Sequence, residues 1–354
     1  MNGGALLVVG FEGTALTPEE RRVLERVRPG GLVLFARNLQ EVDETRALVG
    51  ALRRLLPEAI LCVDQEGGRV DRLRRLVGPA PAPADLAGCR VSRSLRTGRT
   101  VGEALRHFGF DLDFAPVLDL DHGRVDNALD RRCFGRDPRS VVARAGAFLE
   151  GLSEAGILTC LKHFPGLGGA AQDTHHAGSA IDLPATELER DLSPFTRLAP
   201  VADAIMVSHA SYPGWDPSRQ PATLSPAIAT DLLRRRLSFD GIAFTDDLEM
   251  QALGGWEEIA ERAEAALIAG CDGLLVCRRL EETPGIAERL EAARFESRRL
   301  EAAARWERLR AALSARRKRV EGRKPLSLET VRLRLARLAT SVPQNGMSSS
   351  PGGK

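Results

Sequence analysis

The sequence turns abruptly from apolar to polar in the stretch Gly156-Ile157-Leu158-Thr159-Cys160-Leu161-Lys162-His163-Phe164-Pro165-Gly166. A Gly-rich loop follows, and residues 163–176 contain three of the six His of the chain. A buried strand that ends in titratable groups and a loop is typical of one spoke of an α/β active site. The alternative, a core Lys-His pair beside a surface loop, stays open on this stretch alone.

Short apolar runs of the same kind recur, and most are separated by segments with helical periodicity. Continuous apolar strands suit a parallel sheet that is covered on both faces. Eight such runs alternating with helices predict an α/β protein, a (β/α)8 TIM-type barrel with appended C-terminal helices. A doubly wound open sheet is less favoured, because no GxGxxG motif opens the first helix. The apolar runs are 6–9, 31–35, 60–63, 112–114, 158–161, 204–207, 242–244 and 274–276, and the helical segments are 17–27, 44–55, 140–154, 186–199, 226–236 and 257–270.

The composition changes after the last apolar run, so we expect the catalytic barrel to occupy residues 1–280. Residues 281–340 are rich in Glu, Arg, Ala and Leu, with apolar residues at helical spacing. They predict a helical extension packed on the barrel. The basic run 316–319 is interpreted as a solvated helix end favoured by the helix dipole. Residues 341–354 contain too few apolar residues to fold, and we expect a disordered tail.

The composition also excludes several classes of protein. The 354 residues are 43% hydrophobic, enough for a large core, and the net charge of +2 is spread without a phosphate-binding stripe. The six Cys form no CxxC pair or zinc-ribbon spacing, which fits a reducing compartment. No stretch approaches about 18 consecutive apolar residues, and no signal-peptide pattern opens the chain. We therefore expect a cytoplasmic protein that binds neither nucleic acid nor membrane.

Titratable groups follow five successive predicted strands. In a parallel barrel the carboxyl ends of the strands meet at one rim, so these groups predict an active site there. Turns that only connect elements would more often carry neutral residues. The groups, in strand order, are Asp64, Glu66, Arg69 and Arg72; Asp119, Asp130 and Arg132; Lys162 and His163; His209; and Asp246 and Asp247.

Some of these groups have simpler structural interpretations. Asp247 is interpreted as a cap of the turn that follows it. Glu66 could form a structural ion pair with Arg69. His209 is expected to position other groups by hydrogen bonding, and His122 to be a structural or surface residue.

Four ordered motifs make the chain resemble a known family. They are Asp64-Gln65-Glu66-Gly67-Gly68-Arg69-Val70, Lys162-His163-Phe164-Pro165-Gly166, Asp173-Thr174-His175 and Phe244-Thr245-Asp246-Asp247-Leu248-Glu249-Met250. Together they resemble glycoside hydrolase family 3, and most of all its bacterial single-domain β-N-acetylhexosaminidases of cell-wall recycling. The resemblance implies a retaining hydrolase that removes terminal N-acetylglucosamine from small carbohydrates, either peptidoglycan fragments or chito-oligosaccharides. It implies no cofactor and no metal.

The resemblance also implies a role for each site residue. Asp246 would be the nucleophile that forms a glycosyl-enzyme. His175, oriented by Asp173, would be the general acid and then the general base. Imidazole suits both roles because its ordinary pKa, about 6.5, lies near neutrality. The residues implied to hold the hydroxyl and acetamido groups of the sugar are Asp64, Arg72, Arg132, Lys162 and His163.

Two positions depart from the pattern of this family. The family loop usually reads Pro-Gly-His-Gly-Asp, whereas this chain has Pro165-Gly166-Leu167-Gly168-Gly169. Thr245 stands where Ser is commoner. Neither change removes a residue with an implied catalytic role.

Four alternative functions remain open on the sequence. A β-N-acetylglucosaminide phosphorylase or a β-glucosidase would use the same family framework. A non-catalytic sugar-binding barrel is suggested only by the altered loop. A metal enzyme is disfavoured by the Lys162 ammonium beside the site. Its candidate ligands are His163, Asp173, His175 and His176.

Overall fold

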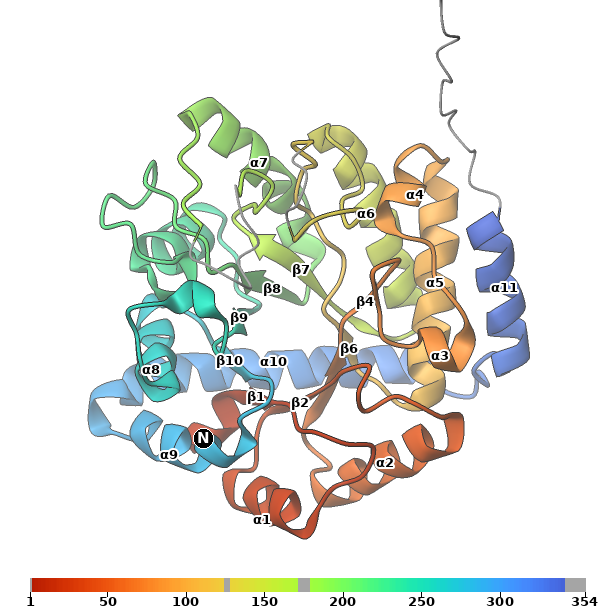
Figure 1. The fold of residues 1–354 in the computed structure, drawn as a ribbon, viewed down its shortest axis with the longest axis horizontal. Helices are drawn as coiled ribbons and strands as arrows, with labels where there is room; N and C mark the ends of the chain where they lie inside the picture. Colours follow the sequence, from red (N-terminus) through yellow and green to blue (C-terminus); the bar gives the residue numbers. More distant parts are fainter. Residues whose placement is uncertain (1, 124–127, 171–178, 341–354) are drawn as a thin grey trace, which may run out of the picture.

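The computed structural model describes residues 2–123, 128–170 and 179–340. Within these residues, eight parallel strands close into a barrel in the order β1, β10, β9, β8, β7, β6, β3, β2 (Figure 1). The barrel closes between the first and last strands, where Leu7 pairs with Leu274 and Val9 with Val276. The predicted (β/α)8 barrel is therefore confirmed. The strands are β1 (Leu7–Val9), β2 (Gly31–Leu34), β3 (Ile60–Val63), β6 (Leu112–Asp113), β7 (Leu158–Phe164), β8 (Ala204–Val207), β9 (Ile242–Asp247) and β10 (Gly273–Val276).

Helices surround the barrel, and those that the sequence predicted lie close to the predicted segments. A small hairpin of β4 (Gln65–Gly67) and β5 (Val70–Asp71) extends from β3. Among the described helices, none is long and apolar enough to cross a membrane. The helices are α1 (Pro18–Val27), α2 (Val42–Leu55), α3 (Arg74–Val77), α4 (Pro83–Ala87), α5 (Val91–Phe108), α6 (Pro138–Glu154), α7 (Ala185–Leu198), a π-type helix (Ala227–Arg236), α8 (Ile259–Ala269), α9 (Thr283–Leu290), α10 (Glu296–Val320) and α11 (Leu328–Thr340).

Local sequence signals explain where the helices begin. The Thr17 hydroxyl accepts the amide of Glu20 and the Glu20 carboxylate accepts the amide of Thr17, which forms a capping box in front of Pro18. Asp137 caps α6 by a single bond, its carboxylate accepting the amide of Ser140.

Three aspartates lie at the amino ends of strands, and each makes the same kind of hydrogen bond to a neighbouring strand. Asp111, Asp203 and Asp272 directly precede β6, β8 and β10. Each carboxylate accepts a backbone N–H of the neighbouring strand: from Leu61 at 2.9 Å, from Thr159 at 2.9 Å and from Ala243 at 3.0 Å, respectively. We call these three residues the floor carboxylates.

Helix α10 covers the same end of the barrel and pairs with all three floor carboxylates (Figure 1). Arg298, Arg316 and Arg317 approach Asp272, Asp203 and Asp111 at 2.5, 2.9 and 2.6 Å, respectively. The helix also places the Trp306 ring against the Phe244 ring of β9, with the ring centroids 5.8 Å apart and nearly perpendicular. The indole N–H donates to the Asp272 carbonyl at 2.9 Å. The amino end of the barrel is thus closed by protein.

Candidate active site

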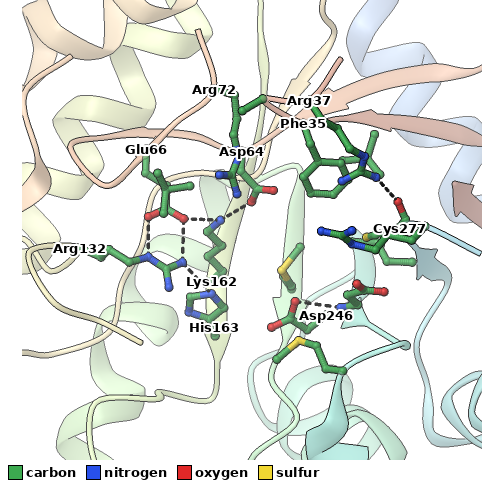
Figure 2. Close-up of a pocket in the computed structure, with 18 residues that line it drawn as sticks. Phe35, Arg37, Asp64, Glu66, Arg72, Arg132, Lys162, His163, Asp246 and Cys277 are labelled. Carbon is green, nitrogen blue, oxygen red and sulfur yellow. Dashed lines mark hydrogen bonds and ion pairs between the residues drawn. The ribbon is translucent and has the colours of Figure 1, made fainter. Parts of the chain in front are cut away.

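A cavity of about 450 Å³ opens at the carboxyl ends of the strands (Figure 2). It brings together six of the eight residues to which the resemblance gives a role, and these six come from the segments at the ends of β3, β6, β7 and β9. Asp173 and His175 lie outside the described residues. The six that line the cavity are Asp64, Arg72, Arg132, Lys162, His163 and Asp246.

Lys162 is the centre of a buried ion-pair network in this cavity. Its ammonium lies 2.6 Å from Asp64 Oδ1 and 2.6 Å from Glu66 Oε1, and its side chain is only 2% exposed. Arg132 Nε and Nη2 donate to the two oxygens of Glu66, each at 2.8 Å, in the bidentate geometry that guanidinium and carboxylate prefer. Glu66 therefore pairs with Arg132 and Lys162, and the interpreted ion pair with Arg69 is wrong.

The network keeps its members charged. Burial alone would raise the pKa of Glu66, but Arg132 and Lys162 hold it below its ordinary value. Burial would lower the pKa of Lys162, but Asp64 and Glu66 raise it. Two buried cations are balanced by two carboxylates, so this wall presents fixed, oriented polar groups to a ligand.

His163 is held by both ring nitrogens. Nδ1 lies 2.7 Å from Asp119 Oδ2, and Nε2 lies 3.3 Å from Arg132 Nη2. Asp119 also accepts the amides of His163 and Leu167, at 3.2 and 2.7 Å. These contacts assign the Nδ1 proton to the bond with Asp119 and leave Nε2 to accept from Arg132. We call Asp64, Glu66, Arg132, Lys162 and His163 the deep wall.

An irregularity in β7 allows Lys162 and His163 to share one cavity. Successive residues of a regular strand point to opposite faces. Here the pairing of β7 with β8 shifts register between Leu161 and Phe164. Both side chains line the cavity.

The β4–β5 hairpin returns the chain so that Arg72 reaches the cavity. Gly67 has φ of 93°, and a Cβ there would lie 2.1 Å from the Pro81 carbonyl oxygen, so the turn requires glycine. Arg72 Cζ lies 5.8 Å from the Phe35 ring centroid. Its buried Nε has no hydrogen-bond partner among the described residues, which leaves a donor beside the cavity.

Asp246 and Asp247 form the end of β9, and both line the cavity. Asp246 Oδ1 accepts the amide of Asp247 at 2.9 Å, and Asp247 Oδ1 accepts the amide of Glu249 at 3.1 Å. The second contact agrees with the interpretation of Asp247 as a turn cap. Burial, followed by the nearby carboxylates of Glu249 and Asp246, raises the pKa of Asp247 to about 7.

His209 lies beside Asp247 and contacts its backbone. Its Nε2 lies 2.9 Å from the Asp247 carbonyl oxygen and its Nδ1 lies 2.8 Å from Thr223 Oγ1. The ring thus contacts the backbone at the end of β9, next to Asp246, as expected for a positioning residue.

The sequence did not single out the residues that β2 and β10 contribute. Phe35 and Arg37 follow β2, and Cys277 and Arg278 follow β10; all four line the cavity. Arg37 Cζ lies 4.4 Å from the Phe35 ring centroid. The sequence did contain a signal for the β2 residues: an aromatic residue, Phe35, at the end of a strand, followed two residues later by Arg37. The remaining lining residues are apolar: Val33, Ala36, Val70, Met206, Met250 and Leu275.

The altered loop is part of the buried packing. Leu167 is buried, and its amide binds Asp119. A Cβ on Gly169 would lie 2.6 Å from Leu183 Cδ1 and 3.0 Å from Ile181 Cγ2, so the usual Asp would require these neighbours to move.

Among residues 2–123, 128–170 and 179–340, no group of three or more His, Cys, Asp or Glu side chains is placed to hold a metal ion. Of the suggested ligands, His163 is bound to Asp119 and Arg132. Asp173, His175 and His176 lie outside the described residues.

Comparison with known proteins gives one consistent result. Residues 2–309 match the glycosyl hydrolase family 3 N-terminal domain. A β-hexosaminidase of Pseudomonas aeruginosa is 42% identical over 280 residues, which cover 78% of this chain and 83% of that protein.

Solved structures agree. NagZ from Neisseria gonorrhoeae, solved in complex with N-trifluoroacetyl-D-glucosamine, is similar with a TM-score of 0.78 and 31% identity, over 96% of this chain and 99% of that one. A family 3 β-N-acetylglucosaminidase from a Paenibacillus species is similar with a TM-score of 0.83 and 30% identity, over 95% of this chain and 67% of that one.

Proposed function

The chain belongs to glycosyl hydrolase family 3, and on this premise we propose that it is a retaining β-N-acetylglucosaminidase acting on peptidoglycan fragments in the cytoplasm. One observation carries the proposal: the carboxylate of Asp246 lies in the same cavity as the deep wall. Figure 2 shows Glu66, Arg132 and His163 on one side of this cavity and Asp246 on the other. A sugar bound to the deep wall would therefore lie beside a carboxylate.

In the first step, an Asp246 carboxylate oxygen attacks the anomeric carbon and the glycosidic oxygen leaves with a proton from His175. The result is a covalent glycosyl-enzyme. In the second step, His175 takes a proton from water as the water attacks the same carbon and frees Asp246. Two inversions give net retention. Asp173 would accept the other ring N–H of His175 and stabilise the imidazolium.

The deep wall would bind the hydroxyl groups. Asp64 keeps one carboxylate oxygen beyond its contact with Lys162, and the Arg72 side chain lines the same cavity. Preorganised charges stabilise a transition state without reorganising during the reaction. The apolar side chains Val33, Met206, Met250 and Leu275 suit the methyl of an acetamido group. The Neisseria relative, solved with an N-acyl glucosamine analogue, supports this substrate class.

The proposal is tested by the release of p-nitrophenol from its N-acetyl-β-glucosaminide and from its β-glucoside, each with and without phosphate. We expect release from the first substrate alone, independent of phosphate. The first-formed sugar, followed by NMR, should be the β anomer.

Other outcomes would replace the proposal. Phosphate-dependent formation of a sugar 1-phosphate would indicate a phosphorylase, and preference for the glucoside would indicate a β-glucosidase. No cleavage of either substrate would favour the non-catalytic barrel.

A further inference from the structure

An ion pair outside the cavity lies against the backbone that leads to Asp173 and His175. It joins His122, in the segment that follows β6, to Asp191 of α7, with His122 Nε2 2.8 Å from Asp191 Oδ1. The two side chains are only 14% and 2% exposed. Because an ionised carboxylate can only accept hydrogen bonds, the imidazole donates this one. His122 is thus a largely buried side chain with a fixed orientation.

We call residues 165–170 the loop base. Two of its glycines contact the ion pair so closely that no side chain would fit. A Cβ on Gly166 would lie 2.9 Å from Asp191 Cβ, and a Cβ on Gly168 would lie 2.7 Å from His122 Cδ2. In close-packed protein, a change at one of these surfaces is felt at the other. The position of the loop base therefore depends on the ion pair beneath it.

Other contacts tie the loop base to the sugar site. The Leu167 amide donates to Asp119, which also holds the deep wall, and the Tyr212 hydroxyl donates to the Gly166 carbonyl at 2.9 Å. Among the described residues, His122 makes no hydrogen bond to the deep wall, and it does not line the cavity. The ion pair thus supports the loop base from a side that takes no part in sugar binding.

Charge strengthens the ion pair. The hydrogen bond to Asp191 raises the pKa of His122, against the effect of burial and of the nearby Arg190. Burial raises the pKa of Asp191, and His122 counteracts this effect. The distance of 2.8 Å is the length expected of a bond between a protonated nitrogen and a carboxylate, which is about twice as strong as a neutral hydrogen bond. The geometry therefore favours the charged pair.

We propose that His122 is a positioning residue for the reaction: anchored on Asp191, it fixes the loop base and thereby the placement of His175. The proposal rests on the proposed function, because it needs His175 as the general acid and base. Displacement of a reacting group by about 1 Å can cost about 10²-fold in rate. Loss of the His122 anchor should therefore slow both proton transfers and leave the binding of the sugar to the deep wall unchanged.

The test compares His122→Leu with His122→Gln. Leucine removes the bond to Asp191, whereas the amide of glutamine can donate in place of the imidazole. On N,N′-diacetylchitobiose we expect His122→Leu to lower kcat/KM by about 10- to 100-fold, and His122→Gln to stay within about threefold of the wild type. Rates are scaled to the folded fraction, measured by urea unfolding.

A second substrate distinguishes positioning from general damage. With p-nitrophenyl N-acetyl-β-glucosaminide, His122→Leu should give a burst of product and then slow turnover, because His175 activates the water less well. Azide needs no general base and should restore the rate. The inhibition constant of N-acetylglucosamine should stay within about twofold of the wild-type value, since the deep wall is intact.

Two further variants control for stability and for the loss of a histidine. The double variant His122→Leu/Asp191→Asn leaves no unpaired buried carboxylate, so it should unfold closer to the wild type and keep the kinetic defect. His107→Leu should keep wild-type kinetics with both substrates. His107 is also partly buried and bonded through Nε2, to Arg46 at 2.7 Å, but it belongs to α5 and does not line the cavity.

The outcomes separate the two levels of inference. Wild-type rates in His122→Leu, or an equal loss in His122→Gln, overturn the anchoring role of His122 and leave the proposed function standing. A loss that azide does not restore, or that comes with weaker binding of N-acetylglucosamine, shows a merely structural residue and overturns it too. Failure of the wild type to cleave either substrate overturns the proposed function and this inference with it.

Discussion

The two ends of the barrel use the same chemistry for different purposes. At the amino end, the floor carboxylates Asp111, Asp203 and Asp272 pair with arginines of α10. At the carboxyl end, Asp64 and Glu66 pair with Lys162 and Arg132. Both ends therefore contain buried clusters of oppositely charged side chains.

The difference lies in what covers them. A long helix and the Trp306 ring occupy the floor, whereas about 450 Å³ of open space adjoins the deep wall. A buried ion pair alone is therefore no sign of a site. Oriented charge beside an open cavity is the more informative combination.

The largest expected effect is a loss of activity, and it distinguishes the carboxyl end of the barrel from the amino end. Asp246→Asn should lower kcat/KM by at least about 10⁴-fold, because no other group supplies the covalent bond to the sugar. The thermal unfolding midpoint should stay within about 2 °C, since Asn keeps an oxygen that can accept the amide of Asp247. A folded variant with substantial activity would reduce Asp246 to a structural carboxylate like those of the floor.

The next effect concerns His175, the proposed general acid and base. His175→Ala should lose about 10²- to 10⁴-fold on natural glycosides, the usual range for general acid–base catalysis. With p-nitrophenyl substrate, whose leaving group needs no proton, a burst of product should precede slow turnover, and azide should restore the rate. A variant as active as the wild type on natural glycosides, or an inverted product, rejects this mechanism.

One matched pair tests the comparison directly. Glu66→Gln and Asp272→Asn each remove a buried carboxylate and leave cations behind, so each should lower the free energy of unfolding by about 3–5 kcal/mol. Only Glu66→Gln should also lower kcat/KM, because Arg132 and Lys162 lose their fixed orientation. Urea unfolding and rates scaled to the folded fraction measure both. A catalytic defect in Asp272→Asn at full folding would show that the ends are coupled.

The smallest effect is a pH dependence of stability. The pKa of Asp247 is raised to about 7 by burial and by Glu249 and Asp246. The folded state therefore favours the protonated carboxyl, so this stability is present below the unfolded pKa of about 3.9 and is lost as pH rises towards 7. Asp247→Asn should be more stable than the wild type by about 2 kcal/mol at pH 8, with the difference vanishing near pH 4. A constant difference across this range would contradict the assignment.

The sequence predicted the strands and the gathering of polar residues at one rim of the barrel, because both follow from local patterns. It did not predict α5, whose interior contains Gly98 and Gly102, residues that weaken isolated helices. In the fold these glycines allow close packing on α6: a Cβ on Gly98 would lie 2.1 Å from the Phe148 carbonyl oxygen, and one on Gly102 would lie 2.6 Å from Ala155 Cβ. Tertiary contact overrides local propensity here.

Contacts between side chains that are far apart in the sequence could not be predicted from local patterns either. Glu66 meets Arg132 across the long segment that follows β6, and Arg37 meets Arg278 only because β1 joins β10. The polar residues themselves were visible, but their pairing depends on barrel closure. This is why the deep wall was partly anticipated and the grouping of Phe35, Arg37 and Arg278 was not.

The closure of the floor by α10 has a consequence for the order of synthesis. Arg317 follows its partner Asp111 by 206 residues. At about 5–20 residues per second, a ribosome needs roughly 10–40 s to make that interval. During this time the nascent strands hold carboxylates whose α10 arginines do not yet exist, and the Phe244 ring lacks the cover of Trp306. The amino end of the barrel is therefore covered only after α10 has been made. A chain halted before α10 would expose the floor carboxylates to chaperones and proteases.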